Sequence, residues 1–155
     1  MAKKRIYLGA DHGGFDLKED IKEFLQHQGC IVIDLGNEDY DKDDNYPFFA
    51  QKVANETVKT GQLGILVCTT GVGMDMAANK VKGARSVLAH NSDIALMASE
   101  HEGANILCLG AKYTSLSQAK KIIKAWLSKE FSRAKRHRNR VAMLKSIEND
   151  IWVKT

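Results

Sequence analysis

A thiol followed by closely spaced glycines is the most chemically suggestive pattern in this sequence. Cys68 ends the apolar run L-G-I-L-V-C, and Gly71 and Gly73 follow within five residues. Glycines allow a tight turn, so the amides of such a loop converge at the start of the next helix and attract negative charge. The same field favours the thiolate form of a cysteine. The segment predicts a base beside an oxyanion-binding loop; a small buried cysteine ending a core strand is the alternative.

Further polar residues stand beside apolar runs. Asp11 and His12 follow the run I-Y-L-G-A, and His101 stands shortly before the run N-I-L-C-L-G. A lone histidine is more often a surface residue than a catalyst. We expect both imidazoles to lie at the same sheet edge as Asp11 and Cys68, where histidine serves proton transfer.

The spacing of these glycines excludes three common sites. A dinucleotide fingerprint would need glycine where Met76 stands, and the Gly-Lys-Ser/Thr of a P-loop is absent. A cysteine phosphatase would place an arginine at the position of Met74. The pattern instead indicates proton-transfer or covalent chemistry on a small molecule.

The surrounding elements alternate between short apolar runs and helix-length segments. We expect strands over residues 6–10, 30–35, 63–68, 85–89 and 105–110, and helices over 15–28, 48–59, 74–80, 92–100 and 117–129. Strands that are apolar throughout are buried on both faces, which predicts a five-stranded parallel sheet in a Rossmann-like three-layer α/β domain. Ligands bind beyond the carboxyl ends of such strands.

A last helix, about 139–149, has no following strand. We therefore expect one domain over residues 1–155, in which a C-terminal helical arm from about 130 to 155 contacts a partner subunit.

Positive charge is concentrated before this last helix. Residues 120–140 hold nine Lys/Arg and one acid, which gives this segment a net charge of +8. The whole chain has a net charge of +4, so the remaining residues carry a net charge of −4. Arg136 and Arg140 are four apart and share a helix face if the helix has begun by then. Two guanidiniums on one face suit a phosphate monoester. His137 stands between arginines, which predicts easy deprotonation and a hydrogen-bond donor role.

Length and composition exclude several classes of protein. At 155 residues, with 44% hydrophobic and 27% charged residues, the chain is long enough to bury a core. Cys30, Cys68 and Cys108 form no CxxC motif, so neither a disulfide framework nor a zinc site is expected. No apolar run approaches a membrane span, and the basic segment has few aromatics beyond Trp126 and Phe131. We expect a cytoplasmic protein without a membrane or nucleic-acid partner.

These motifs together resemble the type B ribose-5-phosphate isomerase family, which includes galactose-6-phosphate isomerase subunits. The resemblance covers about residues 4–150. It rests on G-A-D-H-G-G-F (9–15), L-K (17–18), D-N-Y-P (44–47), C-T-T-G-V-G (68–73), A-A-N-K (77–80) and the R-H-x-x-R-V tail (136–141).

The resemblance implies a role for each matching position. Cys68 would be the base that moves a proton between C2 and C1 of the open-chain sugar, and Thr70 with the amides of Gly71, Val72 and Gly73 would hold the enediolate. His101 would assist ring opening, with Asp11 as a polar partner of the sugar hydroxyls. The remaining substrate-binding positions are His12, Tyr46, Thr69, Asn79, Glu102, Lys112, Arg136 and Arg140.

The same resemblance implies a cofactor-free, metal-free aldose–ketose isomerase that works as a homodimer or homotetramer with shared active sites. Ribose 5-phosphate and ribulose 5-phosphate are the expected substrate pair. Another aldose phosphate (allose 6-phosphate, galactose 6-phosphate or a tetrose phosphate) and a non-catalytic, flavodoxin-like phosphate-binding module are the alternatives.

Thr69, Glu102 and Lys112 depart from the usual glycine, asparagine and arginine of the family, and Met74 replaces the glutamate base of some members. We expect Thr69 to narrow the pocket, and Glu102 to be protonated, turned away or paired with Lys112.

Overall fold

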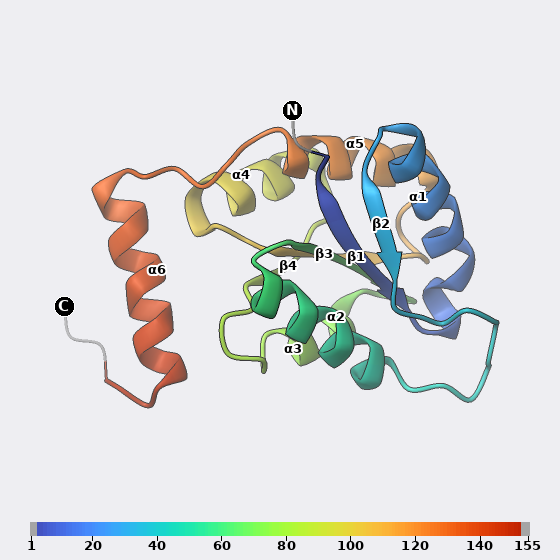
Figure 1. The fold of residues 1–155 in the computed structure, drawn as a ribbon, viewed down its shortest axis with the longest axis horizontal. Coiled ribbons are helices and arrows are strands. Elements are labelled where there is room, and N and C mark those ends of the chain that lie inside the picture. The colour runs from blue at the N-terminus through green and yellow to red at the C-terminus, as the bar shows by residue number, and fades with distance from the viewer. Residues whose placement is uncertain (1–2, 153–155) are drawn as a thin grey trace.

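A computed structural model describes residues 3–152. Within this range a β-strand and a helix alternate five times, and a sixth α-helix follows (Figure 1). The strands are β1 (Arg5–Ala10), β2 (Ile31–Asp34), β3 (Leu63–Cys68), β4 (Ser86–Leu88) and β5 (Ile106–Gly110). The helices are α1 (Phe15–His27), α2 (Tyr46–Thr60), α3 (Val72–Ala78), α4 (Ser92–Glu102), α5 (Leu116–Leu127) and α6 (Lys135–Glu148), with a short 3₁₀ helix η1 (His12–Gly14) before α1.

The five strands form one parallel sheet in the order β2-β1-β3-β5-β4. One face packs on α1, α4 and α5, and the other on α2 and α3. The three-layer α/β architecture expected from the sequence is therefore confirmed. After β1 the chain adds β2 on one side, and it later adds β3 on the other. The carboxyl ends of β1 and β3 thus form a topological switch point, where open α/β sheets bind ligands.

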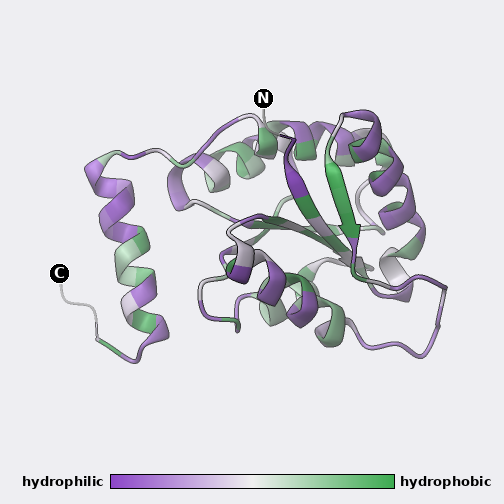
Figure 2. Ribbon diagram, viewed as in Figure 1, coloured by the Kyte–Doolittle hydropathy of each residue, from purple (hydrophilic) through white to green (hydrophobic). Residues whose placement is uncertain are grey.

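Burial on both faces explains the continuously apolar strands. In β1, Ile6 and Leu8 enter one core while Tyr7 between them enters the other, because successive side chains of a strand point to opposite faces. The central strands β3 and β5 are almost wholly buried. Figure 2 shows the apolar strands enclosed by helices whose outer surfaces are hydrophilic. Because these strands are fixed in the core, they also fix the positions of the residues that directly follow them.

Helix boundaries differ from the expected ones by a few residues. Helix α2 begins at Tyr46, before Pro47, because proline is compatible with the first turn of a helix. Helix α6 begins at Lys135 instead of 139. Its earlier start places Arg136 and Arg140 one turn apart on one face, as the spacing required. Strand β2 starts after Cys30, which is half-buried.

Helix α6 stands beside the domain, joined to α5 by an extended segment (Figure 1). Near its C-terminal end the Glu148 carboxylate accepts a hydrogen bond of 2.9 Å from the Gly83 amide. Near its other end His137 is buried, with 4% of its surface exposed. No helix within residues 3–152 is long and apolar enough to cross a membrane.

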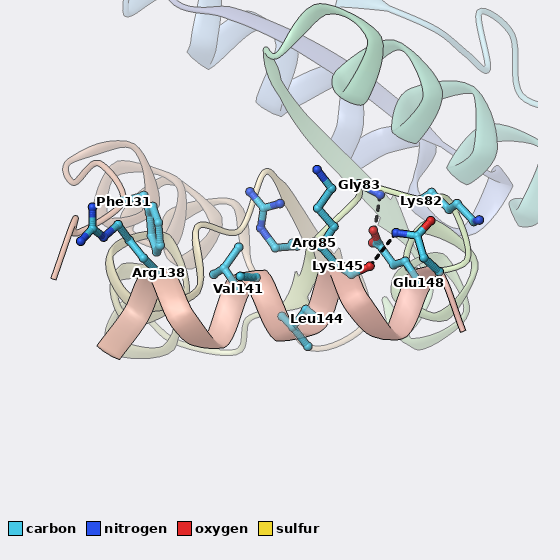
Figure 3. A pocket seen from close by; sticks show the side chains of 11 residues that line it. Lys82, Gly83, Arg85, Phe131, Arg138, Val141, Leu144, Lys145 and Glu148 are labelled. Carbon is cyan, nitrogen blue, oxygen red and sulfur yellow. Dashed lines mark hydrogen bonds between the residues drawn. The ribbon is translucent and has the colours of Figure 1, made fainter. Parts of the chain in front are cut away.

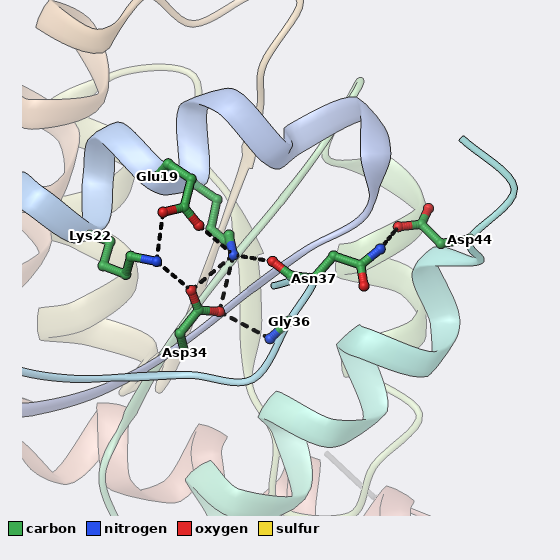
Figure 4. A network of polar contacts seen from close by, with 7 residues as sticks. Glu19, Lys22, Asp34, Gly36, Asn37 and Asp44 are labelled. Atoms are coloured by element: carbon green, nitrogen blue, oxygen red, sulfur yellow. Dashed lines mark hydrogen bonds and ion pairs between the residues drawn. The ribbon is translucent and has the colours of Figure 1, made fainter. Parts of the chain in front are cut away.

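A fully buried lysine secures the loop that leaves β2. The Lys18 ammonium lies 2.9 Å from a carboxylate oxygen of Asp34 and 2.8 Å from one of Glu19, and it also donates to the carbonyl of Asn37 (Figure 4). Lys22 binds the same two carboxylates from a position that is partly exposed. These ion pairs hold the pKa values of Asp34 and Glu19 below their usual range, although burial opposes that effect.

We predict that Lys18→Met lowers the free energy of unfolding by about 1–3 kcal/mol, because it removes the fully buried cation and leaves the Asn37 carbonyl without its donor, while Lys22 still reaches the two carboxylates. Lys22→Met is the matched control and should cost less than about 1 kcal/mol, since its ammonium is reached by water. Urea unfolding of the two variants measures both values. Equal losses would show that burial of Lys18 does not determine its contribution.

Candidate active site

Cys68 occupies the position that the sequence indicated, at the carboxyl end of β3 and immediately before α3. Its side chain is 5% exposed, and its Sγ accepts a hydrogen bond of 3.1 Å from the Gly71 amide. Gly71 has a φ of +80°, a left-handed conformation that suits glycine. The Val72 and Gly73 amides begin α3 without an intrahelical partner, and the Val72 amide donates to the Thr70 hydroxyl at 3.3 Å. The thiol thus faces a loop built to stabilise negative charge.

Two glycines allow neighbouring segments to approach this loop. A Cβ on Gly14 would lie 2.3 Å from the carbonyl oxygen of Val67, so η1 packs directly against the end of β3. A Cβ on Gly73 would lie 2.7 Å from the ring of Tyr46, which places the start of α2 against the start of α3. The ends of β1 and β3 and the first turn of α2 therefore meet around the thiol.

The residues after β1 form a hydrogen-bonded acid–imidazole cluster. Asp11 caps η1 by accepting from the Gly14 amide, and burial raises the pKa of its carboxyl, with the charge of Asp44 adding to the effect. His12 Nδ1 lies 2.7 Å from Asp44 Oδ1, which also accepts from the His12 amide at 3.0 Å. The hydrogen bond to Asp44 raises the pKa of His12, and the charge of Asp11 acts in the same direction. The protonated form of His12 is therefore favoured, which suits contact with an anion.

Asp11, His12 and Asp44 also offer three possible metal-ligand atoms within 4.8 Å of one another. The hydrogen bond between His12 and Asp44 uses two of these atoms, and Asp44 also accepts from the Asn37 amide group. The internal hydrogen bonds account for the cluster without an ion, so we assign no metal role to it.

A second cluster lies where α4 ends and α6 begins. The rings of His101 and His137 are 4.4 Å apart between centroids, with their planes tilted by 33°. Arg136 Nε donates to His137 Nε2 at 3.1 Å. Burial lowers the pKa of His137, and the charge of Arg136 lowers it further. His137 is thus readily deprotonated, as the sequence suggested, but it accepts from Arg136 where a donor role was expected, and its buried Nδ1 has no protein partner within residues 3–152.

The two clusters lie at opposite edges of the sheet, which corrects the expected common position of the histidines. Cys68 ends β3, whereas His101 lies in the last turn of α4, which runs back to the amino edge before β5. At about 3.3 Å per residue, a six-residue strand separates the edges by roughly 17 Å. The carboxyl edge gathers Asp11, His12, Tyr46, Cys68, Thr69, Thr70, Gly71, Val72, Gly73 and Lys112; the other cluster holds His101, Glu102, Arg136 and Arg140.

The positions of three further residues bear on their expected roles within a single chain. Glu102 lies with His101, turned away from the Cys68 loop, which was one of its three expected arrangements. It makes no ion pair with Lys112, which follows β5 at the other edge and donates its amide to Thr69. Asn79 follows the far end of α3 and exchanges hydrogen bonds with the backbone of Ser86, so its amide joins two elements and does not line the Cys68 loop. Thr69 packs its hydroxyl against Gly13.

Two functional residues carry no local signal in the sequence. Asp44 matched the motif D-N-Y-P but was given no role, and its contact with His12 spans 32 residues. Lys18 matched a motif, but nothing in the sequence linked it to this site. In the structure Lys18 holds Asn37, and Asn37 donates to the carboxylate that orients His12 (Figure 4). Only the folded chain brings these residues together.

A thiol, an imidazole and helix-start amides at the switch point of an open parallel sheet define an enzyme site for a small anionic molecule. The family model for "Ribose/Galactose Isomerase" matches residues 6–144. Ribose-5-phosphate isomerase B of Mycobacterium tuberculosis is 40% identical over 96% of this chain and 92% of its own length. This chain belongs to the ribose/galactose isomerase family.

Solved structures agree with this assignment. Ribose-5-phosphate isomerase B of Clostridium thermocellum superposes with a TM-score of 0.89 at 43% identity, covering 94% of this chain and 98% of that one. The Mycoplasma genitalium isomerase B, solved with bound ribulose 5-phosphate, gives a TM-score of 0.89 at 38% identity, covering 94% of this chain and 97% of its own.

We predict that Asp44→Asn lowers the pKa of His12 towards the ordinary histidine value, because the hydrogen bond to a carboxylate is its main cause. As the pH rises, the His12 imidazolium of the variant would then lose its proton at a lower pH than that of the unchanged protein. Titration of the His12 ring protons by NMR measures the midpoint. Asp43→Asn is the control, since Asp43 is exposed and makes no contact with His12, and its midpoint should stay in place. An unchanged midpoint in Asp44→Asn would contradict the assignment.

Proposed function

We propose that this protein interconverts ribose 5-phosphate and ribulose 5-phosphate by proton transfer through an enediolate. Membership of the family supports the reaction class, and the names of its relatives support this sugar pair. The observation that carries the mechanism is the position of Cys68, whose sulfur lies at the start of α3 against the Gly71 amide. A protein that only bound phosphate would need the loop but not the thiol.

The carboxyl-edge cluster supplies the groups that isomerisation needs. As a thiolate, Cys68 removes the proton from C2 of the open-chain aldose and returns it to C1 of the enediolate. The negative oxygen that develops during this transfer faces the helix-start amides of Val72 and Gly73, and the Thr70 hydroxyl accepts from the Val72 amide beside it. Asp11 lies beside this loop as a partner for the sugar hydroxyls. His12, held by Asp44, contacts the phosphate.

The second cluster, with His101, Arg136 and Arg140, supplies ring opening and the remaining phosphate contacts. Within one chain this cluster lies at the other edge of the sheet. We therefore propose that each active site combines the carboxyl edge of one chain with His101, Arg136 and Arg140 of a second copy. A closed two-fold pair would complete two sites at once.

Exposed apolar residues beside each cluster support this assembly. On α6, Met143 and Ile147 continue the face that carries Arg136 and Arg140, and they are 38% and 60% exposed. On α3, Val72 and Met76 are 49% and 62% exposed beside the Cys68 loop. Grouped apolar side chains rimmed by polar ones are typical of protein contacts.

We predict that Cys68→Ser reduces kcat by about 10²–10⁴-fold, the range attributed to a positioned general base, while the protein folds normally. A coupled assay of ribulose 5-phosphate formation measures kcat. Cys30→Ser is the matched control, because Cys30 lies before β2 at the amino edge, and it should retain full activity. Near-normal turnover of Cys68→Ser would remove this thiol from the mechanism.

We further predict that two inactive variants complement each other. Chains with Cys68→Ser and chains with Arg136→Ala/Arg140→Ala should each be nearly inactive, whereas a mixed dimer holds one intact site of its two. Mixing after dissociation and reassociation should therefore restore activity. The control combines Cys68→Ser with Asp11→Ala, both at the same edge, and should recover none. If mixed dimers form without activity, the arm serves its own subunit.

A further inference from the structure

A cavity of about 600 Å³ separates α6 from the turn before β4, and it belongs to neither catalytic cluster. Figure 3 shows Val141 and Lys145 of α6 on one side of it, with Gly83 and Arg85 of the turn on the other. On an α-helix, the residues that line this cavity lie opposite the face that carries Arg136 and Arg140. The proposed contact with a second copy would leave the cavity open.

The lining of this cavity carries a large excess of positive charge. Its cationic residues are Lys82, Arg85, Arg138 and Lys145. Glu148 is the one acidic residue in the lining, and its carboxylate accepts from the Gly83 amide (Figure 3). Within residues 3–152 none of the four cations forms an ion pair. Like charges gathered without counter-ions repel one another, so an anion at this place would lower the free energy of the folded chain.

Arg85 shows this lack of a counter-ion most clearly. Its side chain is only partly exposed, and its Nε donates to the carbonyl oxygens of Glu102 and Gly103, which fixes the plane of the guanidinium. The two terminal nitrogens donate to no protein acceptor among the described residues. Burial lowers the pKa of Arg85, and the charge of Glu148 only partly opposes this effect. A guanidinium held in this way is pre-organised for phosphate oxygens.

We propose that this cavity is a second anion site that binds a polyphosphate, the chemistry shared by inorganic pyrophosphate and the diphosphate of a nucleotide. Its volume lies in the range of small-molecule sites, roughly 300–1,000 Å³, and exceeds what one phosphate fills. Arg85 of the turn and Lys145 of α6 line the same cavity and hold the phosphates. Phe131, Val141 and Leu144 form an apolar wall beside them, against which a base can pack. The ligand contacts both α6 and the domain.

Isothermal titration calorimetry at about 150 mM salt, where charges more than about 8 Å apart are screened, tests the proposal. Pyrophosphate and ADP are titrated separately into the full-length protein. We expect one cavity site per chain beside the catalytic phosphate contacts, and Lys145→Glu should weaken binding to the cavity by about tenfold or more, about 1.4 kcal/mol. Lys121→Glu on α5 makes the same charge change on an exposed residue outside the cavity and should have no effect.

Arg136→Ala separates this site from the catalytic one, because it alters the opposite face of α6. Polyphosphate binding that survives Arg136→Ala and is lost in Lys145→Glu supports the cavity, whichever reaction the enzyme catalyses. Tighter binding of ADP than of pyrophosphate would identify a nucleotide as the ligand, and equal binding would identify the phosphate chain alone. Failure of both anions to bind below millimolar concentration overturns the proposal. Equal losses in Lys145→Glu and Lys121→Glu, or loss in Arg136→Ala alone, also overturn it.

Discussion

A parallel sheet sends all its carboxyl ends to one edge, and the organisation of this molecule follows from that constraint. Cys68 ends β3 at that edge, whereas His101 belongs to a helix that runs back to the other. Because both faces of the sheet are covered by helices, no side chain of one edge reaches the other through the core. In the proposed mechanism the chain therefore carries two halves of a site that it cannot join, and a second copy is the simplest means of joining them.

Each half is held by buried polar contacts. At the carboxyl edge a chain of contacts leads from Lys18 through Asn37 and Asp44 to His12, so an ion pair in the interior determines the orientation of an imidazole at the surface. At the other edge the neutral ring of His137 accepts from Arg136 and stacks on His101. In both halves a side chain outside the reaction fixes one that would meet the substrate. Such pre-organisation is what electrostatic catalysis requires.

The sequence predicted the layers of the fold because each strand is apolar throughout and each helix is bounded by recognisable residues. It also placed Asp11 and Cys68 correctly, since both follow the strands that they terminate. His101 was misplaced because it precedes β5, and a residue before a strand stands at the amino end, opposite the carboxyl end where Cys68 lies. Asp44 was missed because its partner lies 32 residues away, and no local pattern reports such a contact. The start of α6 was expected four residues late, because a basic segment carries no capping signal.

The central claim is that a single chain holds only half of a working site. Sedimentation velocity and specific activity, measured on the same samples over a dilution series, test it directly. The account predicts that activity per chain falls in parallel with the fraction of dimer and approaches zero for the monomer. A monomer that sediments as one chain and retains full specific activity would contradict it.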